Sequence, residues 1–257
     1  MGTFFQALVS ASRCGAVELR EAQEHIMIDR NVMFTRTLRR VAAAMMPSFM
    51  VTASLGQPTD SVWVGGTGNW SAASNWQPPI VPDNAGAAAF RAFVDTDAAS
   101  SSTVFCNGDF GVSGLTVDVG DVLQIVAERS LRIDGAGPIV NNGTIVIGAN
   151  PGGGATRLWL DDADHTLSGA GVLELTNDTF PGQSLITSSP FTTVRLTQAA
   201  GHTIRGAGLI TPGGGAIGST LFLTNHGLIV ADRPGQRLRI TPTGSPSAPV
   251  NFNDGVM

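Results

Sequence analysis

The side chains best suited to acid–base chemistry form one acidic cluster near the middle of the chain. Asp161, Asp162 and Asp164 stand close together, and Arg157 comes just before them. Two carboxylates beside a cation can exchange protons with a glycosidic bond. Adjacent positions of a β-strand point to opposite faces, however, so Asp161 and Asp162 could serve one bond only at a kink. We therefore interpret the cluster as a solvated turn, with polysaccharide chemistry as the alternative and a weak calcium site as a minor option.

The histidines show no spacing that would bind a metal. His165 and His202 occupy the same place in two copies of a repeated segment, and Leu131 occupies it in a third copy. A position that accepts leucine is a packing position, so we predict that both histidines are structural. His226 falls among residues typical of a turn. No His-x-x-x-His or paired Cys/His spacing of the kind that binds zinc occurs, and we predict neither a metal nor a cofactor.

The composition excludes several kinds of chemistry. Lysine is absent and all 15 basic residues are arginines, which rules out a Schiff-base lysine and a phosphate-loop lysine. Ser168, Ser184 and Ser219 lack the Gly-x-Ser-x-Gly setting of a nucleophilic serine. From Asp60 onward the chain has 16 acidic residues and nine arginines, a net charge of −7. An acidic surface is repelled by phosphate, so we do not expect nucleic acid as a partner.

The segments that would position these side chains are repeated. Residues 165–173 (HTLSGAGVL) return as residues 202–210 (HTIRGAGLI), and residues 131–139 (LRIDGAGPI) are a weaker copy. The Gly-Ala-Gly cores start at positions 135, 169 and 206, so they are 34 and 37 residues apart. A short strand, a glycine corner and another short strand at such spacing are typical of a stacked repeat. We expect each interval to cover roughly two coils.

Short segments of alternating apolar and polar residues occupy the chain from residue 111 to residue 257. Residues 115–119 (LTVDV) show the pattern that gives a strand one face toward a core. A second repeated element, residues 140–146 (VNNGTIV) and 224–230 (TNHGLIV), places asparagines at turns, where they can form a ladder. We predict an all-β fold, a right-handed parallel β-helix of three-sided coils. A β-sandwich is the alternative, because it also has many short strands.

Three of the four tryptophans lie in one glycine-rich segment before these repeats. Residues 63–70 read WVGGTGNW, and Trp76 follows in an Asn-Trp pair before a proline loop. This stretch resembles a motif near the start of large secreted bacterial proteins, so the chain is similar to autotransporter-passenger-like and filamentous-haemagglutinin-like surface proteins. We predict that residues 55–110 form a spacer and a cap in which Trp63, Trp70 and Trp76 close the first coil. The alternative is an exposed platform on which these rings bind a sugar.

The first 54 residues differ in character from the β-rich part. Residues 33–54 contain a basic stretch, an uncharged apolar run of eleven residues and small residues at the exit, the order of a secretory signal peptide. The run is shorter than the roughly 20 apolar residues of a membrane helix, so we expect no membrane span. Residues 1–32 have mixed charge, and we interpret them as a non-native N-terminal extension. Cys106 is then the single cysteine of the exported part, interpreted as a small buried hydrophobe.

Together these patterns predict a protein that is secreted or held at the surface of a Gram-negative bacterium. Its role would be structural or adhesive, and it would bind extracellular glycans or other surface proteins without catalysis. The alternative is a pectate-lyase-like β-helix that binds or degrades polysaccharides, with Asp161, Asp162, Asp164 and Arg157 as its site. Of the four sequence motifs of polygalacturonases, only the Asp-Asp piece is matched. Residues 111–257 would be a truncated array, because no translocator barrel follows them.

Overall fold

The computed structural model of the protein describes residues 57–86, 88–94, 101–148, 150–161, 163–213 and 218–241, together with the backbone of residues 252 and 253. The predicted extension (1–32) and signal peptide (33–54) lie outside these residues, and so does Asp162. The described part of the chain consists of β-strands joined by turns and loops, with a short 3-10 helix, η1 (Ala73–Asn75), near its start.

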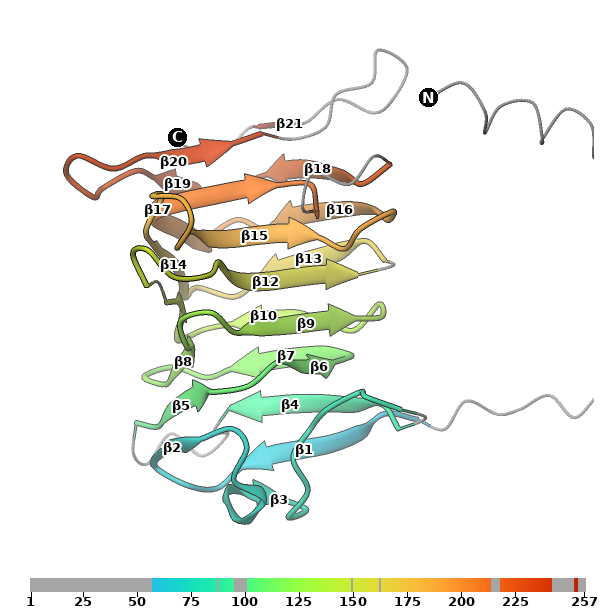
Figure 1. Cartoon of the computed structure of the whole chain (residues 1–257). Coiled ribbons are helices and arrows are strands. Elements are labelled where there is room, and N and C mark those ends of the chain that lie inside the picture. The colour runs from blue at the N-terminus through green and yellow to red at the C-terminus, as the bar shows by residue number, and fades with distance from the viewer. Residues whose placement is uncertain are drawn as a thin grey trace, which may run out of the picture. The chain divides into compact units, whose positions relative to one another are not determined.

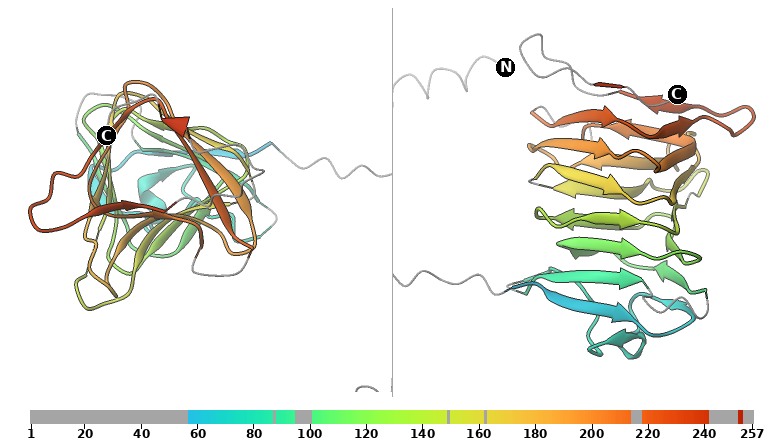
Figure 2. Two further views of the ribbon diagram at one scale, coloured as in Figure 1. Left: turned by 90° about the horizontal axis from the view of Figure 1, so that it is seen from above. Right: turned by 180° about the vertical axis from the view of Figure 1, so that it is seen from behind.

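The strands wind into coils that stack along one axis and form three sheets (Figure 1). A full coil places one strand in each sheet, and each strand pairs in parallel with the strands one coil before and one coil after it. Figure 2 shows the coils from above, superimposed around one interior. The predicted parallel β-helix is confirmed. The alternative β-sandwich is excluded, because it would need antiparallel layers.

Among the described residues, sheet 1 contains nine strands, which are parallel except for β3 at the first edge. In spatial order they are β3 (Trp76–Gln77), β1 (Thr59–Trp63), β4 (Phe90–Val94), β7 (Gly114–Val117), β10 (Ile139–Asn141), β13 (His165–Ser168), β16 (Thr193–Gln198), β18 (Thr220–Asn225) and β21 (Phe252–Asn253).

Sheets 2 and 3 share β17 (Thr203–Thr211), which runs through the corner between them. The other strands of sheet 2 are β2 (Thr67–Asn69), β5 (Thr103–Cys106), β8 (Val122–Ile125), β11 (Thr144–Ile147), β14 (Val172–Thr176) and β19 (Leu228–Val230). The other strands of sheet 3 are β6 (Phe110–Val112), β9 (Ser130–Asp134), β12 (Thr156–Asp161), β15 (Ser184–Ser188) and β20 (Leu238–Ile240).

The coils begin before the predicted boundary at residue 111, so the division at that position is corrected. The stretch FRAFV in β4 already has the alternation of a half-buried strand, and its exposure follows that pattern. β4 pairs with β1 on one side and with β7 on the other, and β5 pairs with β8. Residues 59–106 therefore contain both the cap and strands of the solenoid.

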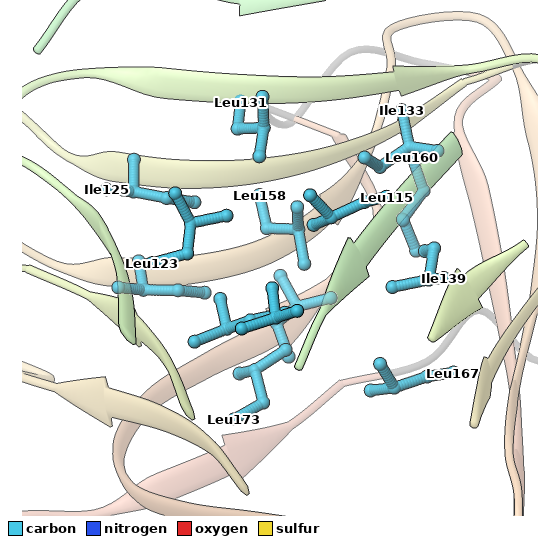
Figure 3. Close-up of a cluster of buried hydrophobic side chains, with 14 of the residues drawn as sticks. Leu115, Leu123, Ile125, Leu131, Ile133, Ile139, Leu158, Leu160, Leu167 and Leu173 are labelled. Carbon is cyan, nitrogen blue, oxygen red and sulfur yellow. The ribbon is translucent and has the colours of Figure 1, made fainter. Parts of the chain in front are cut away.

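Aliphatic side chains of successive coils lie directly above one another and fill the interior (Figure 3). One column in sheet 2 consists of register partners that are all buried: Val104, Leu123, Ile145, Leu173, Ile204 and Ile229. Burying each leucine or isoleucine side chain contributes roughly 1.5–3 kcal/mol to folding. Because every coil buries its neighbours' inner face, the stack is one continuous core with three outward faces.

The three Gly-Ala-Gly copies form three different corners of the coil. Gly135 lies between sheets 3 and 1, Gly169 between sheets 1 and 2, and Gly206 between sheets 2 and 3. Their φ angles are +114°, +98° and +105°, a region that glycine adopts without strain. The 34- and 37-residue intervals thus cover four strands, which is one coil and one further side. The prediction of roughly two coils per interval is wrong, because the copies share a corner geometry and do not stack upon one another.

Candidate functional site

The structure divides the predicted acidic cluster between two sheets. Asp161 ends β12 in sheet 3, where its largely buried side chain lies 3.7 Å from Arg132. Asp164 comes just before β13 in sheet 1, and its exposed side chain lies 3.7 Å from Arg195. The corner between β12 and β13 turns the chain onto the next side of the coil. Asp161 and Asp164 therefore do not form one site, and Asp162 lies outside the described residues.

His165 and His202 are both buried, as predicted for structural histidines. His165 pairs in register with Leu196, and its Nε2 donates to the carbonyl oxygen of Asp161 at 3.2 Å. His202 accepts at Nε2 from the side-chain amide of Asn141 at 3.0 Å, which requires a neutral ring. Burial lowers the pKa of His165, and it lowers the pKa of His202 to about 4. Both rings are packed and neutral near pH 7.

The tryptophans of the glycine-rich segment form a buried cluster at the first coil. Trp76 packs edge-on against Trp63 and Trp70, with ring centres 5.1 and 4.7 Å apart. The indole N–H groups of Trp63, Trp70 and Trp76 donate to the carbonyl oxygens of Gly66, Pro82 and Trp70 at 3.1, 3.0 and 2.8 Å. All three rings are at most 1% exposed. They close the end of the core, and none of them offers a face to a sugar.

A groove of about 450 Å³ lies on the outer face of sheet 3. Its lining includes residues of β6, β9 and β12, which lie one above another in Figure 1. Its floor consists of outward side chains that the register of β9 and β12 places side by side. Ser130 lies beside Arg157 and Arg132 lies beside Trp159. The next pair in the same register is Asp134 with Asp161. Arg157 of the predicted cluster therefore lines the groove, and Asp161 lies next to it.

The polar rim of this groove is held by hydrogen bonds to neighbouring strands. Asp83 accepts from the backbone N–H of Gly111 in β6 at 2.9 Å. Asp109 accepts at one oxygen, Oδ1, from both the backbone N–H and the hydroxyl of Ser130, at 2.8 and 2.7 Å. The side-chain amide of Asn84 donates to Asp134. These hydrogen bonds hold the carboxylates of Asp83, Asp109 and Asp134 around the floor. In each carboxylate, one oxygen atom accepts none of these bonds.

Part of the groove floor is aromatic and cationic. Trp159 projects from β12, and the guanidinium carbon of Arg157 lies 5.8 Å from its ring centre. Arg157 also donates to the carbonyl oxygen of Ala155 at 3.1 Å, which anchors the guanidinium beside the ring. Trp159 is partly exposed, whereas the other three tryptophans are buried. It is thus the one tryptophan of the chain with ring surface open to a ligand.

The groove carries an excess of negative charge. Four carboxylates (Asp83, Asp109, Glu128 and Asp134) line it together with two guanidiniums, Arg132 and Arg157. Burial raises the pKa of Asp134, and the nearby charge of Asp161 raises it further, whereas the bond from Asn84 and the charge of Arg132 oppose this shift. Within the described residues, no three His, Cys, Asp or Glu side chains gather as a metal site.

Sequence reasoning missed most of this groove. Trp159, Asp134 and Asp109 were not among the predicted site residues, although burial alternates along β9 and along β12 as far as Leu160. Alternation alone could have assigned Arg132, Asp134, Arg157 and Trp159 to outer faces. It could not place them side by side, because Leu131 and its register partner Leu158 are 27 positions apart through loops of irregular length.

No family model matches the chain, and the searches of curated proteins and of solved structures found no match. The class of the protein, a parallel β-helix with three-sided coils, is therefore defined by its own sheets. In the described part of the chain, no helix has the length and apolar character needed to cross a bilayer.

Proposed function

We propose that the protein is an exported surface β-solenoid that binds an extracellular partner through the outer faces of its sheets, without turnover. One observation carries this proposal: a continuous core holds three outer faces in fixed register, and one of these faces bears a groove with a partly exposed tryptophan. Partly exposed aromatic and arginine side chains on a rigid scaffold are the features that dominate binding energy at protein interfaces. The resemblance of the tryptophan segment to bacterial surface proteins supports the same role.

Export is tested by expressing the full chain with a C-terminal tag in a Gram-negative host and fractionating the cells. The expected result is a tagged product outside the inner membrane whose first residue lies near Ser54. A tagged product that stays in the cytoplasm, or one that retains Glu18 to Glu24, would contradict export.

Partner binding is tested with the same purified product, labelled and applied to bacterial and host cell surfaces and to extracellular matrix. We expect saturable binding that the unlabelled protein displaces. Binding that does not saturate, or that unlabelled protein fails to displace, would contradict a specific partner-binding face.

A second candidate function is polysaccharide cleavage, which the groove favours because it brings carboxylates and arginines together on a sheet face. Asp134 and Asp161 lie in register on adjacent strands, which is close enough for one carboxyl to influence the other. A carboxyl of raised pKa is suited to donate a proton to a leaving oxygen. Incubation with neutral polymers such as cellulose and chitin, and with pectin and alginate, would then release new reducing or unsaturated ends, and Asp134→Asn and Asp161→Asn would abolish that release. If none of these polymers yields new reducing or unsaturated ends, polysaccharide cleavage is contradicted and the binding function is the one that remains proposed.

A further inference from the structure

We propose that the groove on sheet 3 binds a glycan chain of uncharged pyranose units, with Trp159 as the ring on which one sugar stacks. The inference deepens the proposed function and rests on it, since it assigns a partner class to one outer face. Arg132, Asp109 and Glu128 provide polar groups around the ring. This site is distinct from the buried tryptophan cap, and of the predicted cluster it contains Arg157 alone.

A large aromatic side chain, Trp159, lies outside the core. Positions that point inward along β12 carry Leu158 and Leu160, which are buried, whereas Trp159 between them points outward. Its register neighbours are Arg132 on one side and Thr187 on the other, so both directly flanking side chains are polar. A partly exposed indole at the floor of a concave site provides a flat, electron-rich surface for the C–H face of a sugar.

The fold leaves hydrogen-bond donors and acceptors free in the groove. Asp109 accepts its bonds at Oδ1, and Glu128 accepts from Asn150 at Oε1, at 2.8 Å. Each carboxylate keeps a second oxygen as an acceptor. Arg132 is 54% exposed, and its 3.7 Å separation from Asp161 is longer than a hydrogen bond, so its N–H groups remain available as donors. Planar acceptors and a planar donor around an aromatic floor suit the paired hydroxyls of a sugar ring.

The charge of the groove favours an uncharged sugar over an anionic one. Four carboxylates against two guanidiniums give the groove a net negative potential at neutral pH. A uronate or sulfated polymer would bring further negative charge into a concave site and be repelled. A neutral chain is not repelled, and the volume of about 450 Å³ lies within the range of small-molecule sites.

The test uses the full chain and a panel of defined oligosaccharides: neutral cello- and chito-oligosaccharides, cationic chitosan oligomers and anionic oligogalacturonates. Affinity is measured by titration calorimetry and by the change in tryptophan fluorescence. We expect a neutral oligosaccharide to bind most tightly, and Trp159→Ala to weaken that binding at least tenfold. Binding of oligogalacturonate with equal or higher affinity, or binding of no oligosaccharide at all, would overturn the inference. So would tightest binding of the cationic chitosan oligomers, because their affinity would come from charge alone.

A matched control is provided by a second arginine–aromatic pair outside the groove. Arg195 lies 6.0 Å from the ring centre of Phe222 on the outer face of sheet 1. Phe222→Ala removes the same kind of contact and should leave glycan affinity unchanged. Equal loss in Trp159→Ala and Phe222→Ala would contradict a site at Trp159. If Trp159→Ala fails to fold, Arg132→Gln at an exposed position replaces it, with a several-fold loss expected and unchanged affinity as the contradicting result.

The experiment also separates this inference from the broader proposal. The chain could bind no glycan and still show saturable binding to cells or matrix that persists in Trp159→Ala. That result would be consistent with the proposed function and would contradict a glycan site in the groove. If the unmodified chain binds neither cells or matrix nor any glycan, the proposed function and the glycan site in the groove are both contradicted.

Discussion

Gly206 in β17 lies directly against the backbone of Leu175, its register partner one coil earlier in β14. A methyl group at this glycine would overlap the carbonyl oxygen of Leu175, and the φ of +105° is unfavourable for any residue with a Cβ. The corner therefore closes because the two backbones approach more closely than side chains permit. The same combination of positive φ and close backbone contact occurs at Gly169, against Asn141.

The corner at Gly206 can be tested by Gly206→Ala, compared with Gly235→Ala. Gly235 also has positive φ (+75°), but nothing lies within 4 Å of a Cβ added there. We expect Gly235→Ala to lower the free energy of unfolding by roughly 1–2 kcal/mol, the cost of the backbone conformation alone. Gly206→Ala should cost about 2–4 kcal/mol, because overlap with the backbone adds to that cost. Urea denaturation measures both values, and equal losses would contradict a corner set by coil-to-coil contact.

The tryptophan cap predicts a specific fluorescence signature. Three indoles are buried and Trp159 is partly exposed, so acrylamide should quench only a part of the emission. Trp159→Phe should remove that part and leave emission that is blue-shifted and resistant to quenching. Emission that stays readily quenched in Trp159→Phe would mean that the cap is open to solvent.

The cap also makes a prediction about stability. Trp76 contacts both other rings of the cap and donates its indole N–H to the carbonyl oxygen of Trp70. Trp76→Ala should lower the free energy of unfolding by roughly 3–5 kcal/mol, the usual cost of removing a buried large aromatic side chain. Trp76→Phe keeps a ring but leaves that carbonyl without its donor, so a smaller loss of about 1–3 kcal/mol is expected. A loss below 1 kcal/mol for Trp76→Ala would contradict a cap that seals the core.

Buried His202 predicts that acid weakens the fold. Its pKa is lowered to about 4 in the folded protein, against about 6.5 in an unfolded chain. A histidine with a depressed folded pKa contributes its full stability above pH 6.5, and that contribution is lost as the pH falls toward 4, because the unfolded chain takes up the proton first. Unfolding free energy should therefore drop by roughly 2–3 kcal/mol between pH 7 and pH 4.5 from this group alone. The lowered pKa of His165 adds in the same direction.

Urea denaturation at the two pH values measures this drop in the unmodified chain and in His202→Gln. The variant lacks the titrating ring, so its unfolding free energy should change less with pH. His226→Asn provides the control, because it leaves the His202 ring and its contact with Asn141 in place, so the drop that comes from His202 should remain. If the pH dependence of His202→Gln equals that of the unmodified chain, His202 is not the source of the loss of stability in acid.

The sequence predicted those features that are local. Alternation within five residues marks strands such as β9, and Gly-Ala-Gly marks corners, because both depend on backbone geometry and on the need to bury one face of a strand. The leucine that replaces histidine at position 131 correctly indicated that His165 and His202 are packing residues. These inferences need no knowledge of what lies one coil away.

Features that depend on register could not be predicted in this way. Asp134 and Asp161 share a face because β9 and β12 align, and that alignment depends on loops whose lengths vary from coil to coil. β4 was not predicted as a strand of the solenoid, because the glycine- and proline-rich stretch before it resembled a spacer. The intervals of 34 and 37 residues join corners on different sides of the coil and do not join positions that stack on one another. The length of a coil predicted from them was therefore wrong.

The stacking of coils in this register is the claim on which the outer faces and the groove depend, and a disulfide measures it most directly. Gln124 and Val146 are register partners in β8 and β11, both outward, on strands about 4.8 Å apart. Gln124→Cys with Val146→Cys, in a chain carrying Cys14→Ser and Cys106→Ala, should form an intramolecular disulfide under mild oxidation. Gln124→Cys with Thr197→Cys, which joins sheets 2 and 1, should form none. Mass spectrometry that finds the first link in the monomer and not the second is the predicted result. Absence of the first link, or equal yield of both, would contradict the stacked coils.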